Sequence, residues 1–193
     1  FWNCEKLTEV SMSNSITAIE WSAFSGCESL KKITLPKTLK TIGEKAFFSC
    51  ESLKNIKIPN SVKTIGKSAF SGCYSFTDVK IPNSVKEIEE GAFAGCKNLV
   101  SLTLPNSLKV LNKNVFANCR SLETVTIPNS VTTINEGAFC YCSNLKSVII
   151  PTSVTNIDEY TFEDCHESLA IHGKKNSYAH KYAKKWGFKF KAV

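Results

Sequence analysis

Apolar residues recur along the chain at a spacing that changes within each repeat. In residues 51–73 the apolar positions are Leu53, Ile56, Ile58, Val62, Ile65, Ala69, Phe70 and Cys73. Ile56 and Ile58 alternate with Asn55 and Lys57, which is the period of a strand with one buried face. This part of the pattern therefore predicts a short strand.

A turn and a second side follow this strand. Pro59 has no N–H to donate to a ladder, and Asn60 tolerates turn conformations, so the strand ends there. Val62 and Ile65 begin a second short side of the unit. Residues 67–73 have helix-like spacing over a short length, which predicts one turn of α- or 3₁₀-helix.

The same pattern returns every 23 residues. Cysteines occupy positions 4, 27, 50, 73, 96, 119, 142 and 165, and phenylalanines and prolines keep the same interval. Seven full units, each close to LxxIxIPxSVxxIxxxAFxxC, run from Leu7 to Cys165, and Phe1 to Cys4 form the tail of another. A fixed period of this length predicts a solenoid whose stacked coils bury a shared core. We expect an α/β solenoid of about seven to eight coils, with residues 1–168 as the array.

The last residues, 169–193, depart from the repeat and predict a helix-strand cap. In SYAHKYAKKWGFKF, Ser177 is a candidate N-cap and Gly187 a candidate C-cap. A stripe of Tyr178, Tyr182 and Trp186 is expected to face the core. Phe188 and Phe190 alternate with lysines, which predicts a closing strand. Such a cap would cover the open end of the core.

The unit resembles a known class of repeat. Its LxxIxI core resembles the LxxLxL strand of leucine-rich repeats, and the whole unit resembles the 23-residue, treponemal-type BspA-like repeats of bacteria. The resemblance implies a parallel sheet on a concave face and a non-enzymatic protein-recognition module. It also implies a cell-surface or secreted bacterial protein that adheres to host or other-cell macromolecules, with a protein or glycoprotein as ligand.

One column departs from the usual leucine-rich repeat pattern. Where that pattern has an asparagine ladder, this chain has Ser15, Thr38, Ser61, Ser84, Ser107, Ser130 and Ser153. We expect these hydroxyl groups to bond the backbone between coils in place of the asparagine amides.

Composition adds little to this assignment. The 193 residues are 42% apolar and 21% charged, and no apolar run approaches the length of a membrane span, so we expect no membrane insertion of this segment. The net charge of +7 comes from seven lysines between 174 and 191; the rest of the chain has 17 basic and 17 acidic residues. Since Phe1 lies within a repeat, we expect the chain to belong to a longer array, and a missing signal peptide carries no information on secretion.

Nine cysteines raise the question of disulfides or metal. Eight form one column with a rung spacing of about 4.8 Å, but parallel side-chain vectors give poor disulfide geometry. We expect a buried, reduced ladder, with Cys140, the ninth, exposed and most reactive. The CYC sequence at 140–142 lacks zinc spacing, so no metal site is expected.

Catalytic residues are not indicated. The three histidines, His166, His172 and His180, lie near the C-terminal end. No motif places a base beside a serine or cysteine nucleophile, and no phosphate-binding glycine loop is present. We expect no enzyme activity and no cofactor.

The concave strand face is the candidate binding surface, because solenoids usually bind there. Its outward residues include Lys32, Thr34, Asn55, Lys57, Asp78, Lys80, Ser101 and Thr103. Two alternatives stay open: a structural spacer in a larger surface protein, and polyanion binding through Lys181, Lys184 and Lys185. We expect a monomer that recognises no specific nucleic acid.

Overall fold

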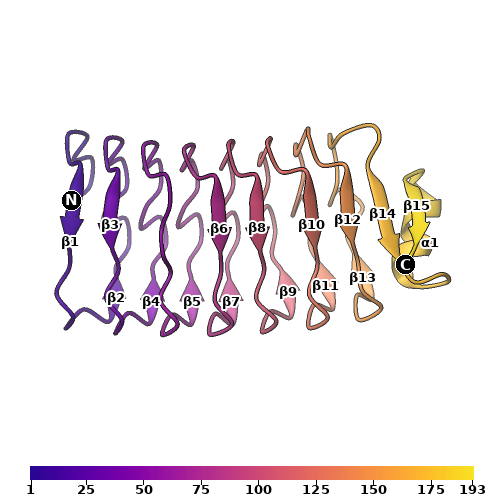
Figure 1. Ribbon diagram of the computed structural model, residues 1–193, viewed down its shortest axis with the longest axis horizontal. Coiled ribbons are helices and arrows are strands. Elements are labelled where there is room, and N and C mark those ends of the chain that lie inside the picture. Colours follow the sequence, from indigo (N-terminus) through magenta and orange to yellow (C-terminus); the bar gives the residue numbers. More distant parts are fainter.

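The computed structural model describes residues 1–193 as a stack of coils along one axis (Figure 1). One side of the stack carries the longer strands β1 (Glu9–Ser11), β3 (Lys32–Thr34), β6 (Asp78–Lys80), β8 (Ser101–Thr103), β10 (Thr124–Thr126), β12 (Ser147–Ile149), β14 (Ala170–Gly173) and β15 (Lys189–Ala192). We call this side the strand face. The short strands are β2 (Ala18–Ile19), β4 (Thr41–Ile42), β5 (Thr64–Ile65), β7 (Glu87–Ile88), β9 (Val110–Leu111), β11 (Thr133–Ile134) and β13 (Asn156–Ile157). The one helix is α1 (Tyr178–Trp186).

Neighbouring strands pair in parallel at the interval of the repeat. Val10 lies opposite Ile33 and Val125 opposite Val148, so equivalent residues of successive coils stand side by side. The predicted solenoid of 23-residue coils is therefore confirmed. Since the pairing is in register, each position of the repeat becomes a column along the stack.

The strand expected around Asn55 and Lys57 is absent. The strand face is interrupted between β3 and β6, and the backbone N–H groups of residues 54–58 donate no hydrogen bond to a neighbouring coil (Figure 1). Ile56 and Ile58 are still buried. Side-chain burial rather than ladder pairing therefore holds this segment in place.

A phenylalanine ladder runs through the core. Each ring from Phe1 to Phe162 stacks on the ring of the next coil, with centroid distances of 5.2–5.8 Å. The rings of Phe47 and Phe70 are 1° from parallel. Around the ladder, the aliphatic, alanine and cysteine columns complete one core that extends along the whole stack.

The cysteine column is tied to this ladder by hydrogen bonds. Each thiol donates to the backbone carbonyl of the phenylalanine 26 residues earlier, at 3.1–3.5 Å; the donors are Cys27, Cys50, Cys73, Cys96, Cys119, Cys142 and Cys165. A thiol is a weak donor, and at most positions it is the second donor to the carbonyl, as at Phe47, which also accepts from Cys50 N–H at 3.2 Å. A disulfide has no S–H and would lose this bond.

The helical turn predicted for residues 67–73 is wrong. Ser68 and Gly72 have φ angles of 52° and 76° in the left-handed region. Alternate N–H groups leave the coil, as when Phe70 N–H donates to the carbonyl of Ala92 at 2.7 Å, while Ala69 N–H donates back to Gly66. In a helix every N–H group would donate within its own coil. In this stack every second N–H group of the segment donates to the next coil instead.

The hydroxyl column bonds the backbone only in part. Thr38 Oγ1 donates to the carbonyl groups of Asn14 and Ile16 at 2.7 Å, and Ser107 Oγ donates to Val85. Four other hydroxyl groups of the column are buried without a partner, namely those of Ser61, Ser84, Ser130 and Ser153. The expected ladder between coils is therefore present at two positions.

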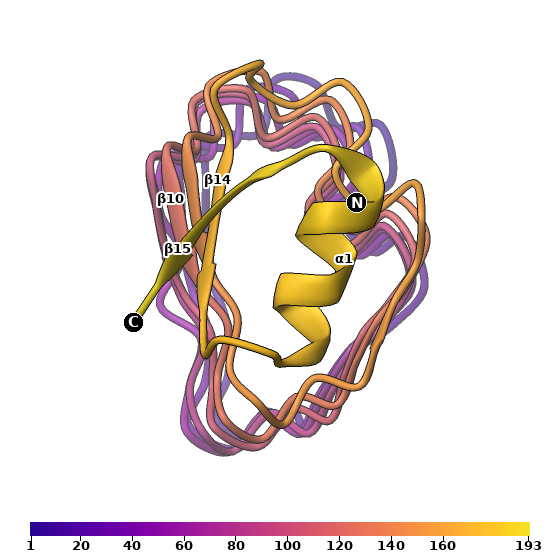
Figure 2. The ribbon, with the colours of Figure 1, turned by 90° about the vertical axis from the view of Figure 1, so that its right-hand side faces the viewer.

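The C-terminal helix and strand close the end of the stack (Figure 2). Ser177 caps α1 by accepting from His180 N–H at 3.4 Å, and Gly187 ends the helix with φ 75°. Strand β15 pairs in parallel with β14, so the helix and the closing strand are confirmed.

The predicted aromatic stripe on α1 is wrong in part. Tyr182 is buried, but Tyr178 and Trp186 are each 39% exposed, because positions four apart drift by about 40° around a helix. The face that meets the core consists of Ala179, Tyr182 and Ala183. Two alanines there let the helix approach the last coil closely.

Removing one ring from the ladder should destabilise the stack. Phe70 is fully buried between Phe47 and Phe93, so we expect Phe70→Ala to lower the free energy of unfolding by about 3–5 kcal/mol in a urea titration. Phe48→Ala is the matched control, since that ring is 37% exposed, and its effect should be below about 1 kcal/mol. Equal effects of the two variants would contradict the ladder as the source of stability.

Candidate ligand-binding face

The strand face carries a groove of about 1020 Å³ across the coils of β6 and β8 and the strandless coil before them. Of the predicted site residues it brings together Asn55, Lys57, Asp78, Lys80 and Thr103. Two smaller hollows, of 450 and 370 Å³, continue it toward the cap. Together they form one polar trough along the stack, which we call the strand-face groove.

The groove has a floor and a wall that come from different parts of the repeat. Outward side chains of β6 and β8 make the floor, where alternate residues of each strand face away from the core. The turns after the strands make the wall, since Pro82 and Asn83 also line the groove. Because both parts are anchored in the core, the groove is formed before any ligand binds.

Sequence reasoning missed the asparagine column of these turns. Asn60, Asn83 and Asn106 line the groove, and Asn83 Oδ1 accepts a hydrogen bond from Asn106 N–H at 2.9 Å. The signal was present in the sequence, because asparagine recurs at the interval of the repeat immediately after the proline. Asparagine at a turn is ordinarily explained by backbone conformation alone, so its place on the wall of the groove was not predicted.

Two of the predicted residues lie outside the groove. Lys32 and Thr34 stand on β3, beyond the strandless coil, and Lys32 Nζ pairs with the carboxylate of Glu9 at 2.6 Å. Ser101 lies in the adjoining smaller hollow rather than in the main groove. The first coils therefore contribute less to this site than the outward pattern indicated.

The charges within the groove are free of partners in the protein. Lys57, Asp78 and Lys80 take part in none of the ion pairs of the molecule. Opposite charges stand near one another on successive coils without satisfying each other. Such groups are available to a ligand that carries both signs of charge.

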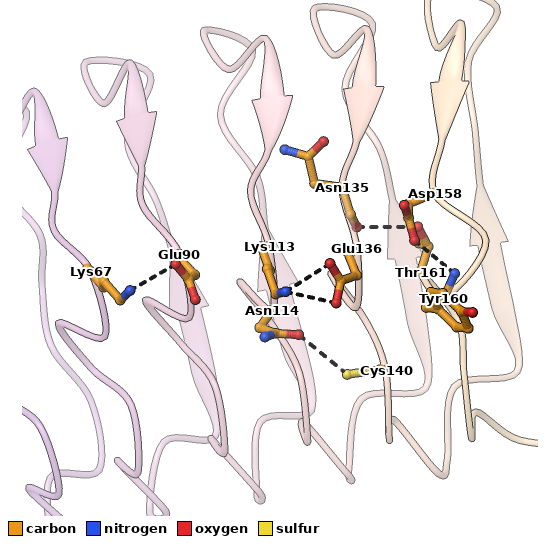
Figure 3. Close-up of polar contacts among 10 residues, drawn as sticks. All are labelled: Lys67, Glu90, Lys113, Asn114, Asn135, Glu136, Cys140, Asp158, Tyr160 and Thr161. Carbon is orange, nitrogen blue, oxygen red and sulfur yellow. Dashed lines mark hydrogen bonds and ion pairs between the residues drawn. The ribbon is translucent and has the colours of Figure 1, made fainter.

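Elsewhere on the surface, lysines and glutamates neutralise each other between coils (Figure 3). Lys67 Nζ pairs with Glu90 at 2.9 Å, and Lys113 Nζ pairs with Glu136 at 2.8 Å. In both pairs the hydrogen bond to the glutamate raises the pKa of the lysine. These lysines therefore keep their charge and are already satisfied.

The prediction that Cys140 is exposed is wrong. Its side chain is 6% exposed and its Sγ lies 3.8 Å from Asn114 Oδ1 (Figure 3). Burial raises the pKa of the Cys140 thiol to about 11. The position is covered in other coils too, since the equivalent residues Ser25 and Ala117 are each 7% exposed. The exposed thiol is Cys4.

Two of the histidines make local contacts at the C-terminal end. His166 Nδ1 lies 2.8 Å from Ser168 Oγ within one local turn. His180 Nδ1 accepts from Asn176 N–H at 3.1 Å, and its ring stacks on Phe190 at 4.3 Å. No third group orients the His166–Ser168 pair, as a hydrolytic triad requires. No group of three metal-ligating side chains comes together anywhere in the chain.

Comparison with known proteins identifies the repeat. The family model described as a BspA type leucine rich repeat region, with 6 copies, matches residues 1–88 and 63–183. No curated protein matches the chain.

The one helix of the molecule is too short and too polar to cross a membrane.

Several solved structures share the fold. A leucine-rich repeat protein of Bacteroides ovatus is 26% identical with a TM-score of 0.83, and the alignment covers 100% of this chain and 53% of that one. A leucine rich cell surface protein of Faecalibacterium prausnitzii is 28% identical with a TM-score of 0.63, covering 93% and 63%. The leucine rich repeat protein of T. pallidum is 27% identical with a TM-score of 0.65, covering 90% and 89%. The chain thus spans less than two thirds of the length of the proteins from B. ovatus and F. prausnitzii.

Thiol labelling tests the placement of the cysteines. At mildly alkaline pH a disulfide reagent should modify one thiol of the folded protein rapidly, and Cys4→Ser should abolish that fast phase. Burial raises the pKa of Cys50 and Cys165 to about 12, so the ladder stays protonated and slow to react. Cys140→Ser should leave the fast phase unchanged. A fast phase lost in Cys140→Ser would contradict the structure.

Proposed function

The chain belongs to the BspA-type leucine-rich repeat family, and on this premise we propose that it is a non-enzymatic recognition module. Proteins of this family and fold are typically not enzymes. The module binds a protein or glycoprotein through the strand-face groove. Its setting is a bacterial cell surface or the secreted state, where it acts as an adhesin-like domain.

The observation that carries this proposal is the set of unpaired charges in a preformed groove. Lys57, Asp78 and Lys80 are held on stacked coils and have no partner of their own. A rigid surface loses little conformational entropy when a ligand binds. A mixed set of charges selects a partner by the order of its charges, which favours a folded protein over a uniform polymer.

The surface setting rests on the relatives. The neighbour from F. prausnitzii is described as a cell surface protein, and it is 28% identical to this chain. Solenoids present extended binding faces without a deep cavity, which suits contact with large ligands outside a cell. A recognition domain and a structural spacer share this scaffold, so the groove is the feature that separates the two functions.

Charge reversal in the groove tests the proposal. Lys57→Glu combined with Lys80→Glu should weaken binding to those members of a panel of immobilised matrix and plasma glycoproteins that the wild-type chain binds. We expect about a 10-fold loss in surface plasmon resonance, mainly in the association rate. Both side chains are exposed, so folding, followed by circular dichroism, should not change.

The matched control reverses two charges on the cap. Lys184→Glu combined with Lys185→Glu changes the net charge equally and lies on α1, away from the groove. If the control loses binding and the groove variant does not, the groove is not the site and the cap lysines are. If the wild-type chain binds no member of the panel, the result counts against recognition and favours a spacer.

A further inference from the structure

A row of lysines lies on four successive coils outside the strand-face groove. Each residue immediately precedes a short strand, β4, β5, β7 or β9, which Figure 1 shows in a row along the lower edge of the stack. The four are Lys40, Lys63, Lys86 and Lys109, and all are exposed. We call them the lysine strip. None of them lines the groove or its extensions.

Backbone hydrogen bonds hold the first three lysines of the strip in register. Lys63 N–H donates to the carbonyl of Lys40 at 2.8 Å, and Lys86 N–H donates to Lys63 at 2.9 Å. At the far end, the carbonyl of Lys109 accepts from Thr132 N–H at 2.9 Å. No backbone hydrogen bond joins Lys109 to Lys86, and β7 and β9 belong to separate sheets. The first three side chains therefore leave the surface at steps of about 4.8 Å, the spacing of neighbouring strands, and Lys109 continues the row on the next coil.

No acid of the protein neutralises the strip. The four ion pairs of the molecule use Lys32, Lys45, Lys67 and Lys113 instead. Of the nearby glutamates, Glu90 is paired with Lys67 Nζ, and Glu89 accepts from the Lys67 N–H at 2.9 Å. Glu87 is the one remaining acid beside the strip, and it makes no ion pair.

A neighbouring column shows what a repeat does when charges serve the protein itself. Four residues after the strip, the column reads Glu44, Lys67, Glu90, Lys113 and Glu136, with alternating sign. Its members pair between coils. The strip instead places like charges beside each other within a Debye length, so they repel. That arrangement is relieved by a ligand with its own row of negative charges.

We propose that the lysine strip binds a linear sulfated polysaccharide lying along the axis of the stack. Lysine suits this ligand because its ammonium group is a mobile point charge that needs no fixed fork geometry. A single-stranded nucleic acid would need aromatic side chains on which its bases stack, and the residues beside the strip lysines in sequence, including Thr41, Thr64 and Val110, are not aromatic. This site is separate from the groove, so either can fail without the other.

A heparin oligosaccharide is the probe for this site. The variant Lys40→Gln, Lys63→Gln, Lys86→Gln and Lys109→Gln should bind it at least about 30-fold more weakly than wild type in titration calorimetry at 50 mM salt. The slope of log affinity against log salt should fall by about 3, since each lost contact removes about 0.7–0.9. Glu87→Gln should tighten binding, because it removes the one acid beside the strip.

The matched control removes the same charge from the cap, with Lys181→Gln, Lys184→Gln, Lys185→Gln and Lys189→Gln. It should change heparin affinity by less than about threefold. An equal loss in the control would overturn the strip as the site. Oligo-dT that binds as tightly as heparin and depends on the strip would replace the polysaccharide by a nucleic acid. Weaker heparin binding in the groove variant Lys57→Glu with Lys80→Glu would move the site to the strand face.

Discussion

The stacking of one phenylalanine ring on the next sets the step on which every other column depends. No coil of 23 residues can bury its own apolar side chains, so each coil is stable only against its neighbours. The rings lie 5.2–5.8 Å apart, close to the spacing that parallel strands require. The cysteine thiol of each coil then adds a hydrogen bond to the carbonyl of a phenylalanine in the coil before. An alanine at that position would fill less of the core and make no such bond.

Because this stacking is in register, surface positions repeat at the same 23-residue interval as core positions. A side chain that faces outward in one unit faces outward at the same place in the next. The groove, the asparagine column and the lysine strip all arise because outward side chains repeat at the same position of successive coils. Rigidity follows as well, since the outward residues of β6 and β8 alternate with side chains locked in the core.

The period made most of the fold predictable, and the exceptions have local causes. The core columns, the parallel pairing, Ser177 and Gly187 followed from repeat spacing and capping chemistry. The turn at residues 67–73 did not, because short apolar spacing cannot distinguish a helical turn from a chain that alternates bonds within and between coils. The strand expected at Asn55 and Lys57 is missing because backbone hydrogen bonds to the neighbouring coils are not made there. The pattern of buried side chains predicts which residues face the core but not whether these hydrogen bonds form. Cys140 was misplaced because small and polar residues in its column, such as Ser25, indicated exposure although that position is buried.

The candidate site was predictable as a face but not as a groove. Sequence placed Lys57, Asp78 and Lys80 outward, while the hollow between them arises from the turn walls and the strandless coil. That coil lacks the longer strand of its neighbours, and the charges of the groove are mixed in sign. The lysine strip instead repeats one charge of the same sign on each of four coils. An irregular ligand, such as a folded protein, is best distinguished by an irregular surface, because the order of its charges carries the information. A polymer of repeating anions has the same charge at every unit, so a column of lysines at a regular interval is complementary to it. The two surfaces of this chain thus differ in the class of ligand they suit for the same reason that they differ in regularity.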